Sequence, residues 1–222
     1  MASEAVQAFE RAERLWHELG DGGARVRSLR ARAWETQRAE GQEAAEAVMR
    51  EALRANEEAV RAAEAAPGPS AADPADPTGP ADATSPAHPA DSIELIRELG
   101  RTHEQLTRLC LKRSDGAPDK EYDSPEQYAV NVAAFEEALG HMGRAVEVFR
   151  RCGEDAVDEF ARAELFTGHL EFALDRFDEA ADRARRARSA VRGVPDPDGS
   201  LMSLAEDCNA LILNTQRNRP GR

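Results

Sequence analysis

Histidines, cysteines and carboxylates are the residues of this 222-residue chain that could do chemistry, and their spacing decides which chemistry is available. A metalloprotease-type zinc site needs two histidines four residues apart on a helix with a glutamate beside the first, and a zinc-finger site needs paired cysteines and histidines at close spacing. Neither pattern is present among His17, His88, His103, His141, His169, Cys110, Cys152 and Cys208. The sequence therefore predicts no catalytic, cofactor or metal site.

Packing or solvation is the predicted role of these side chains. A nucleophilic cysteine needs a histidine and an orienting partner, and no local signature supplies them. Cys152 occupies a position where small residues recur, and Cys208 lies in an apolar helical setting, so both suit a core. His141 and His169 occupy positions in the predicted helical hairpins, where solvated or capping roles are expected. An odd number of distant cysteines also fits a reducing cytoplasm, which is the predicted location.

Charge and hydropathy exclude two classes of partner. The formal net charge is −13, which disfavours strong binding to nucleic-acid phosphates because that binding rests on basic patches. No run of 18 apolar residues without charges is present, and the first 20 residues contain acids from Glu4 onward, so neither a membrane span nor a signal peptide is expected.

The elements that must position these residues are helices. The chain has 42 alanines and few β-branched residues, which favours helix throughout. Apolar periodicity and capping residues predict about nine helices, at 3–19, 24–40, 42–65, 92–112, 125–139, 142–152, 155–174, 177–191 and 200–216. The last of these is expected to cap the fold.

A proline-rich stretch divides the chain. Residues 67–90 contain seven of the 12 prolines and no large apolar side chain, so they cannot offset the entropy of ordering, and a disordered linker or insert is predicted. The domain organisation that follows is an N-terminal set of helical hairpins at 1–66 and a C-terminal helical region at 91–222. The helix at 92–112 has no obvious mate in the sequence.

Two stretches of the C-terminal region align without gaps. "ALGHMGRAVEVFRRC" begins at Ala138 and "ALDRFDEAADRARRA" begins at Ala173, at an offset of 35 residues. Small and large residues that recur in this way are typical of stacked helical hairpins, in which small residues let paired helices approach closely. The aligned pairs are Ala145 with Ala180, Phe149 with Ala184, and Cys152 with Ala187.

This pattern resembles the tetratricopeptide repeat family, in the variant form found in bacterial regulatory proteins. The matching positions are Gly168, Phe177, Ala180 and Ala187 in one copy, and Gly140, Ala145, Phe149 and Cys152 in the copy before. The aromatic residues of the family's first helix are replaced by Glu164 and Glu171, and by Ala129 and Glu136. The resemblance implies an all-α solenoid of antiparallel hairpins; an irregular all-α bundle is the alternative.

The resemblance also implies a function, that of a non-enzymatic scaffold or adaptor that holds a protein or peptide in a concave groove. The first helices of the hairpins, predicted at 24–39, 125–139 and 155–174, would line that groove. Arginines are concentrated in 25–38 and acids in 126–175, which is either ordinary solvation or a groove with oppositely charged ends that could take a basic partner. The candidate groove residues are Arg27, Arg30, Glu136, Glu159, Arg162 and Glu171.

The alternative function is a ligand-sensing or oligomerising helical domain of a bacterial regulatory system, which would need an apolar pocket. The sequence leaves the oligomeric state open.

Overall fold

The structure, a computed structural model, describes residues 3–65, 89–196 and 198–219, and within these ranges it is all-helical. The predicted all-α fold class is confirmed. The predicted linker at 67–90 lies outside the described residues, except for Pro89 and Ala90 at the start of α4. Within the described ranges, no helix is both long enough and apolar enough to cross a membrane. The helices are α1 (Glu4–Glu18), α2 (Gly22–Glu40), α3 (Gln42–Ala65), α4 (Pro89–Leu111), α5 (Pro125–Arg151), α6 (Val157–Ala173), α7 (Phe177–Ala190) and α8 (Ser200–Asn218), with a 3₁₀ turn at Gly153–Ala156 before α6.

Local capping signals set many of the helix ends. The Ser124 hydroxyl accepts a hydrogen bond from the Gln127 backbone N–H at 3.1 Å, and Pro125 follows as the first helical residue. Asp21 caps α2 in the same way, through the Ala24 backbone N–H at 2.8 Å. Gly41 ends α2 with a φ of 98°, a conformation that favours glycine.

One predicted boundary is wrong. The helices expected at 125–139 and 142–152 are a single helix, α5, so the described part of the chain has eight α-helices where about nine were expected. Gly140 and Gly143 lie on the outer side of α5, where an added Cβ would meet no atom within 4 Å. Glycine costs a helix interior only about 1 kcal/mol relative to alanine. Burial of Ala138, Met142 and Ala145 between and beyond these glycines outweighs that cost.

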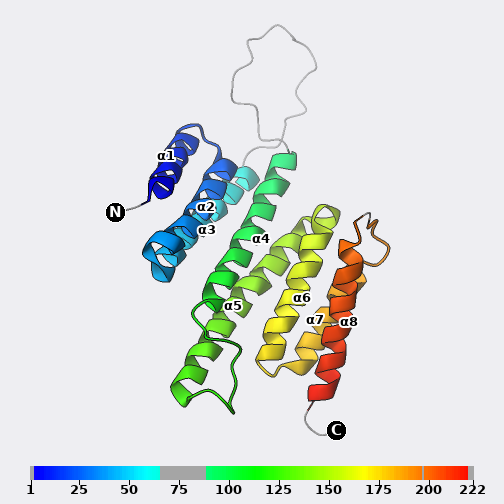
Figure 1. The fold of residues 1–222 in the computed structure, drawn as a ribbon. Coiled ribbons are helices and arrows are strands. Elements are labelled where there is room, and N and C mark those ends of the chain that lie inside the picture. Colours follow the sequence, from blue (N-terminus) through cyan, green and yellow to red (C-terminus); the bar gives the residue numbers. More distant parts are fainter. Residues whose placement is uncertain (1–2, 66–88, 197, 220–222) are drawn as a thin grey trace.

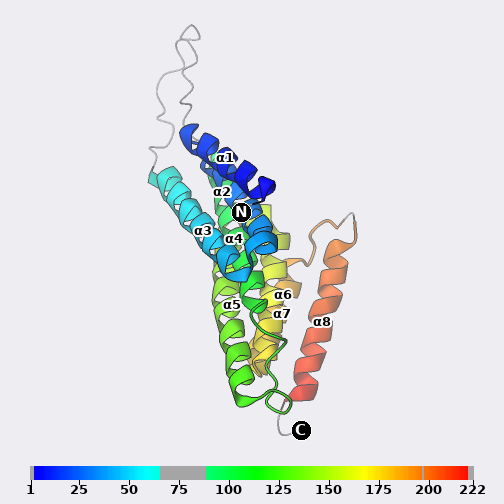
Figure 2. The same ribbon diagram turned by 60° about the vertical axis from the view of Figure 1, so that its left-hand side comes forward.

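The helices pack in chain order. The closest pairs are α2 with α3, α4 with α5, and α6 with α7, and each pair contacts the next through α3–α4, α5–α6 and α7–α8. The helix predicted at 92–112, α4, therefore has α5 as its mate. Contacts also join α2 to α4 and α6 to α8. Figure 1 shows α4, α6 and α8 following one another across the molecule. In the turned view of Figure 2, α3 and α5 lie toward one edge of the molecule and α8 lies at the opposite edge.

Two glycines permit close approach within the pairs. An added Cβ on Gly100 of α4 would lie 2.5 Å from Cε1 of Phe149 on α5. An added Cβ on Gly168 of α6 would lie 3.1 Å from the backbone oxygen of Ala180 on α7. Ala145 and Ala180, the aligned small positions, are both fully buried. Small residues on one helix thus leave room for the side chains and backbone of the paired helix, as close packing of helices requires.

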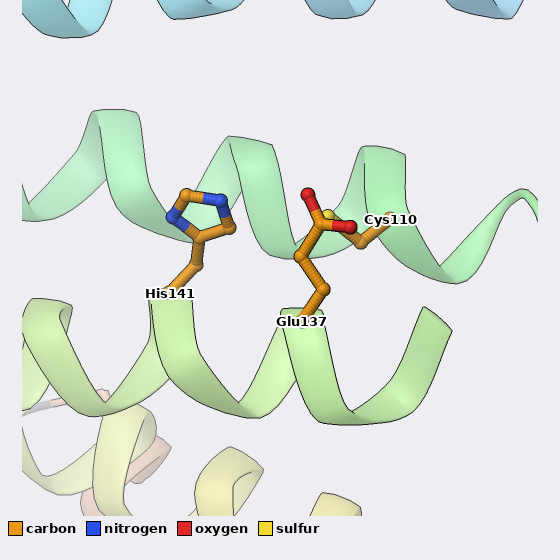
Figure 3. Close-up of side chains that lie close together, drawn as sticks. All are labelled: Cys110, Glu137 and His141. Carbon is orange, nitrogen blue, oxygen red and sulfur yellow. The ribbon is translucent and has the colours of Figure 1, made fainter. Parts of the chain in front are cut away.

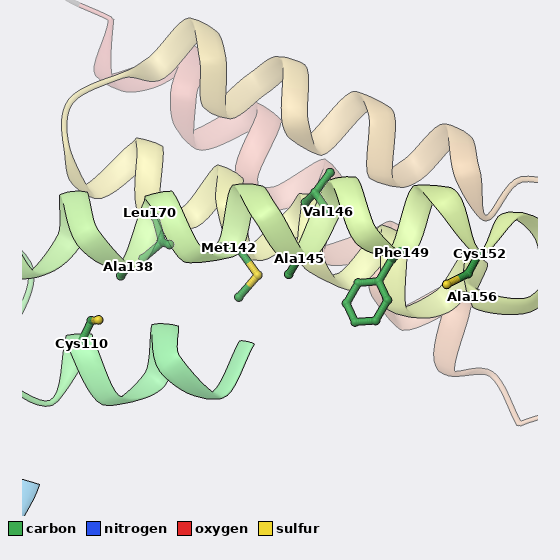
Figure 4. Packing of buried hydrophobic residues seen from close by; sticks show 10 residues of the cluster. Cys110, Ala138, Met142, Ala145, Val146, Phe149, Cys152, Ala156 and Leu170 are labelled. Carbon is green, nitrogen blue, oxygen red and sulfur yellow. The ribbon is translucent and has the colours of Figure 1, made fainter. Parts of the chain in front are cut away.

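The cores lie between successive helices rather than at one centre. Met142, Phe149 and Leu170 are the largest buried members of the core shared by α4, α5 and α6, which Figure 4 shows. Leu29 and Met49 lie in the core of α2, α3 and α4, and the third core joins α6, α7 and α8. Each of these cores is shared by three helices that follow one another in the chain, so it holds each helix against its neighbours.

Candidate functional site

A stripe of charged residues follows one face of α4. Spacings of three and four residues bring such side chains onto the same side of a helix. Charged side chains of α2 and α6 contact this stripe, and together they form what is termed here the α2–α4–α6 face. Its residues are Arg27 and Arg30 of α2; Glu94, Arg97, Glu98, Arg101, Glu104 and Arg108 of α4; and Glu159 and Arg162 of α6.

Ion pairs join the three helices across this face. Arg97 and Arg101 of α4 both contact the Oε1 atom of Glu159 on α6, at 2.7 Å and 3.0 Å. Arg101 also contacts Oε1 of Glu98 at 2.9 Å, and Arg30 of α2 pairs with the other oxygen of Glu98. Glu98 is only 2% exposed, so it depends on both arginines for its charge to be tolerated.

Burial and pairing shift the pKa values of these groups. Burial raises the pKa of Glu159, but hydrogen bonds from Asp158, Arg97 and Arg101 outweigh it and hold the pKa below its ordinary value. Burial also raises the pKa of Glu104, which has arginines nearby but no ion pair within 4 Å among the described residues. Glu159 therefore stays ionised to a lower pH than a free glutamate does, whereas Glu104 takes up a proton more readily.

The network is not closed on itself. Buried polar atoms normally have hydrogen-bond partners, and each exception needs an explanation. Six such atoms on α2, α4 and α6 have no partner among the described residues, and three of them belong to the face: Nε of Arg30, Nε of Arg97 and Oε2 of Glu159. The other three are Nε of Arg32, Oε1 of Gln105 and Oε2 of Glu171. In addition, Arg27, Arg108 and Arg162 are exposed and form no ion pair with any described residue. The face thus carries six arginines and four glutamates, with Asp158 at its edge, in a chain whose net charge is −13.

Two crevices flank Arg27. One, of about 410 Å³, lies between α2 and α4 and is lined by Arg27, Leu95, Glu94, Glu98 and the turn of residues 20–23. The other, of about 390 Å³, lies between α1 and α2, where Phe9 and Trp16 provide apolar walls. Arg27 is therefore a cation at the junction of two hollows, which a ligand side chain could enter.

The structure brings together four of the six residues predicted from the sequence. Arg27, Arg30, Glu159 and Arg162 all lie on the α2–α4–α6 face, although Arg30 and Glu159 are already engaged in ion pairs. The other two residues lie elsewhere.

Glu136 and Glu171 are separate from that face. Glu136 lies on α5 and pairs with Arg176. Glu171 is 6% exposed, pairs with Arg183 at 3.2 Å, and has a pKa raised by burial. The middle helix beside α2 and α6 is α4, and not the predicted segment 125–139, because α5 is one continuous helix packed as the mate of α4.

Sequence reasoning missed the α4 stripe. The signal was present, since charges recur at three and four residues from Glu94 to Arg108 while Leu95, Leu99 and Leu106 occupy other sides of the helix. What the sequence lacked was the identity of the helices on either side, because α4 had no assigned mate.

A set of possible metal ligands was also missed. One ligand atom from each of Cys110, Glu137 and His141 lies within 4.8 Å of the other two, and Figure 3 shows the three side chains gathered between α4 and α5. Glu137 and His141 are one turn apart on α5, but Cys110 belongs to α4, so no local motif links them. Burial, with Glu137 nearby, raises the pKa of the Cys110 thiol to about 12.

The comparisons with known proteins leave the family open. No protein-family model matches the chain, and no curated protein matches it. A solved structure described as the crystal structure of BtubC (BKLC) from P. vanneervenii is similar at 18% sequence identity, over 98% of this chain and 92% of that one, with a TM-score of 0.33. A TM-score that low does not establish a shared fold, so the match carries no inference about function.

Proposed function

We propose that this chain is a non-enzymatic scaffold that holds an acidic segment of a partner protein against the α2–α4–α6 face. The proposal includes a solenoid of helical hairpins similar to tetratricopeptide repeats, in which α2, α4 and α6 are the first helices of three hairpins. The order of packing supports this arrangement, because each of these helices packs most closely against the helix that follows it. Close approach at Gly100 and Gly168 supports it for the second and third hairpins.

The observation that carries the proposal is the incomplete charge network of this face. Arg27, Arg108 and Arg162 are exposed and unpaired within the described part of the chain. Exposed arginines without an ion pair also occur elsewhere in the described residues, as at Arg54 and Arg61. The arginines of this face differ from them because they adjoin an ion-pair network that contains the buried Glu98. Arginine presents a planar fork of donors that matches carboxylates, so unpaired arginines beside buried ones favour an anionic partner.

An acidic partner is favoured over the basic one considered from the sequence. That earlier interpretation relied on Glu136, Glu159 and Glu171 as one acidic end of a groove. Each of these glutamates already has an arginine partner within the chain, and the three do not share a surface. Among the described residues, the face has three exposed arginines without an ion pair and one acid without an ion pair, Glu104, whose pKa is raised by burial, so the excess charge left for a partner is positive.

A capture experiment with charge-reversal variants tests the proposal. The variant Arg27→Glu/Arg108→Glu/Arg162→Glu changes the three unpaired arginines of the face. The matched control, Arg54→Glu/Arg61→Glu/Arg192→Glu, changes three exposed arginines that also lack an ion pair with described residues but lie on α3 and in the loop after α7. The two variants have the same net charge, so non-specific electrostatics affects both equally.

The expected result is a defined set of proteins captured from lysate by the wild type and the control but lost from the face variant. Mass spectrometry identifies them, and their captured regions should be acidic. Circular dichroism should show equal helix content in all three proteins, since exposed substitutions change stability by about 0.5 kcal/mol or less. Recovery of the same proteins by all three would contradict the proposed face.

A further inference from the structure

We propose that Cys110, Glu137 and His141 form a binding site for one zinc-type divalent cation between α4 and α5 (Figure 3). Their side chains offer a cysteine sulfur, a carboxylate oxygen and an imidazole nitrogen, which are the three donor types that zinc takes in proteins. The Cys110 thiol releases its proton to solvent when the metal binds. This inference is independent of the proposed scaffold function, because these residues do not belong to the α2–α4–α6 face.

The geometry is close to what such a cation requires. Glu137 and His141 are four residues apart on α5, so they project from the same side of that helix. Cys110 faces them from the last turn of α4. Ligand atoms around a tetrahedral zinc ion lie about 3.5 Å apart, given metal–ligand distances of about 2.0–2.3 Å. The three ligand atoms here all lie within 4.8 Å of one another, so they must approach by about 1 Å to bind the ion. Rotation of the side chains can supply this movement.

His103 supplies the support that a metal-bound histidine usually has. Its Nδ1 atom lies 3.2 Å from Nδ1 of His141, and it is 3% exposed. A hydrogen bond between the two Nδ1 atoms, with His141 as donor, fixes the His141 tautomer that has its Nε2 lone pair free. A second partner that orients the ligating ring in this way is a regular feature of histidine–metal sites.

The surroundings permit both entry and exchange. Cys110 is buried, whereas the Glu137 side chain is 38% exposed, which leaves a path from solvent. Arg113 pairs with one Glu137 oxygen, and Arg50 lies 3.5 Å from the other. A carboxylate can accept from arginine and still ligate a metal, and hydrogen-bonded carboxylate ligands are common. Three protein ligands also leave a fourth position for water or an external donor.

The donor set selects the class of metal. Thiolate and imidazole favour zinc, cobalt and copper, whereas magnesium and calcium prefer sites built from oxygen alone. Cobalt(II) is therefore a suitable probe, since it replaces zinc in sites of this kind and a thiolate ligand gives it a charge-transfer absorption in the near ultraviolet.

The test is a titration of tag-free, reduced, full-length protein with Co²⁺ and then Zn²⁺. We expect one equivalent of Co²⁺ to bind with the thiolate charge-transfer absorption, and one equivalent of Zn²⁺ to remove it. Cys110→Ser should abolish the absorption. Cys208→Ser is the matched control, because Cys208 is also a buried free cysteine but lies in the core of α6, α7 and α8. Absence of the absorption in the wild type, or its persistence in Cys110→Ser, would overturn the proposal.

Two further variants keep the test decisive if Cys110→Ser does not fold. Glu137→Gln and His141→Gln change half-exposed positions, and each should weaken Co²⁺ binding in a protein of normal helix content. His103→Leu tests the positioning role: it should weaken binding by about 10–100-fold while the absorption at saturation persists. Unchanged affinity in both Glu137→Gln and His141→Gln would refute the site.

Discussion

Replacement of Gly100 by alanine probes the contact that sets α4 against α5. The new Cβ would lie 2.5, 2.7 and 2.9 Å from three ring atoms of Phe149. Real Cβ atoms do not approach carbon so closely, so the ring or the helix must move. Phe149 is fully buried in the core of α4, α5 and α6, and because protein cores are closely packed, a shift of the ring displaces its neighbours.

The expected loss of stability combines two opposed effects. Overpacking of a buried site costs about 1–3 kcal/mol. Replacement of glycine by alanine inside a helix contributes about 1 kcal/mol in the other direction. The net prediction for Gly100→Ala is a destabilisation of about 1 kcal/mol, which lowers the melting temperature by roughly 2–4 °C in a chain of this size.

Gly143→Ala is the control. Gly143 lies inside α5, and an added Cβ there would meet no atom within 4 Å. Only the helix-propensity effect remains, so this variant should be more stable than the wild type by up to about 1 kcal/mol. Thermal and denaturant unfolding of both variants measures the difference, and Gly100→Ala/Phe149→Leu should recover part of the loss. If Gly100→Ala stabilises the protein as much as Gly143→Ala does, the close packing of α4 on α5 is wrong.

Three other predictions concern buried groups. Arg30→Met should destabilise the protein by about 2 kcal/mol because it removes one partner of the buried Glu98. The control Arg27→Met, on the same helix, should change the free energy of unfolding by less than about 0.5 kcal/mol. Equal effects of the two variants would show that the Arg30–Glu98 pair is not needed for stability. Burial, opposed by Arg32, raises the pKa of Glu13 from 4.5 to about 7, so the native state holds a proton that the unfolded state releases, and the free energy of unfolding should fall as the pH rises through this range. Glu13→Gln should reduce the difference in the free energy of unfolding between about pH 5 and about pH 8, measured by denaturant unfolding. An unchanged difference would mean that other groups cause the pH dependence. Ala180→Leu should destabilise by about 1–3 kcal/mol, because Ala180 is fully buried where α6 and α7 approach, and a neutral result in thermal unfolding would mean that this approach is loose.

Much of the fold could be predicted from local signals. The third helix was expected at 42–65 and is Gln42–Ala65, and Ser124 with Pro125 marked the start of α5 correctly. Caps and apolar periodicity act within a few residues, so a single sequence contains them. The error at 140–143 has the opposite origin, because the glycines were read locally while burial of Met142 against other helices decided the outcome.

The candidate sites were less predictable for the same reason. Arg30 and Glu159 were identified as groove residues, but their ion-pair partners were not. Arg30 pairs with Glu98, 68 residues away in the chain, and Glu159 pairs with Arg97, 62 residues away. No local pattern in the sequence links residues at such separations. The zinc-type cluster likewise draws Cys110 from one helix and His141 from another. Such pairings depend on which helices become neighbours, and the sequence alone left the mate of α4 undetermined.

Site-specific photo-crosslinking tests the proposed scaffold function most directly. A photoreactive amino acid replaces Arg162 on the α2–α4–α6 face in one protein and Arg61 on α3 in another, and each is irradiated in living cells of the source organism. Both arginines are exposed and unpaired among the described residues, so the substitutions are matched. The account predicts a covalent adduct with an acidic protein segment from position 162 and none from position 61. Equal adducts from both positions, or an adduct from position 61 alone, would contradict it.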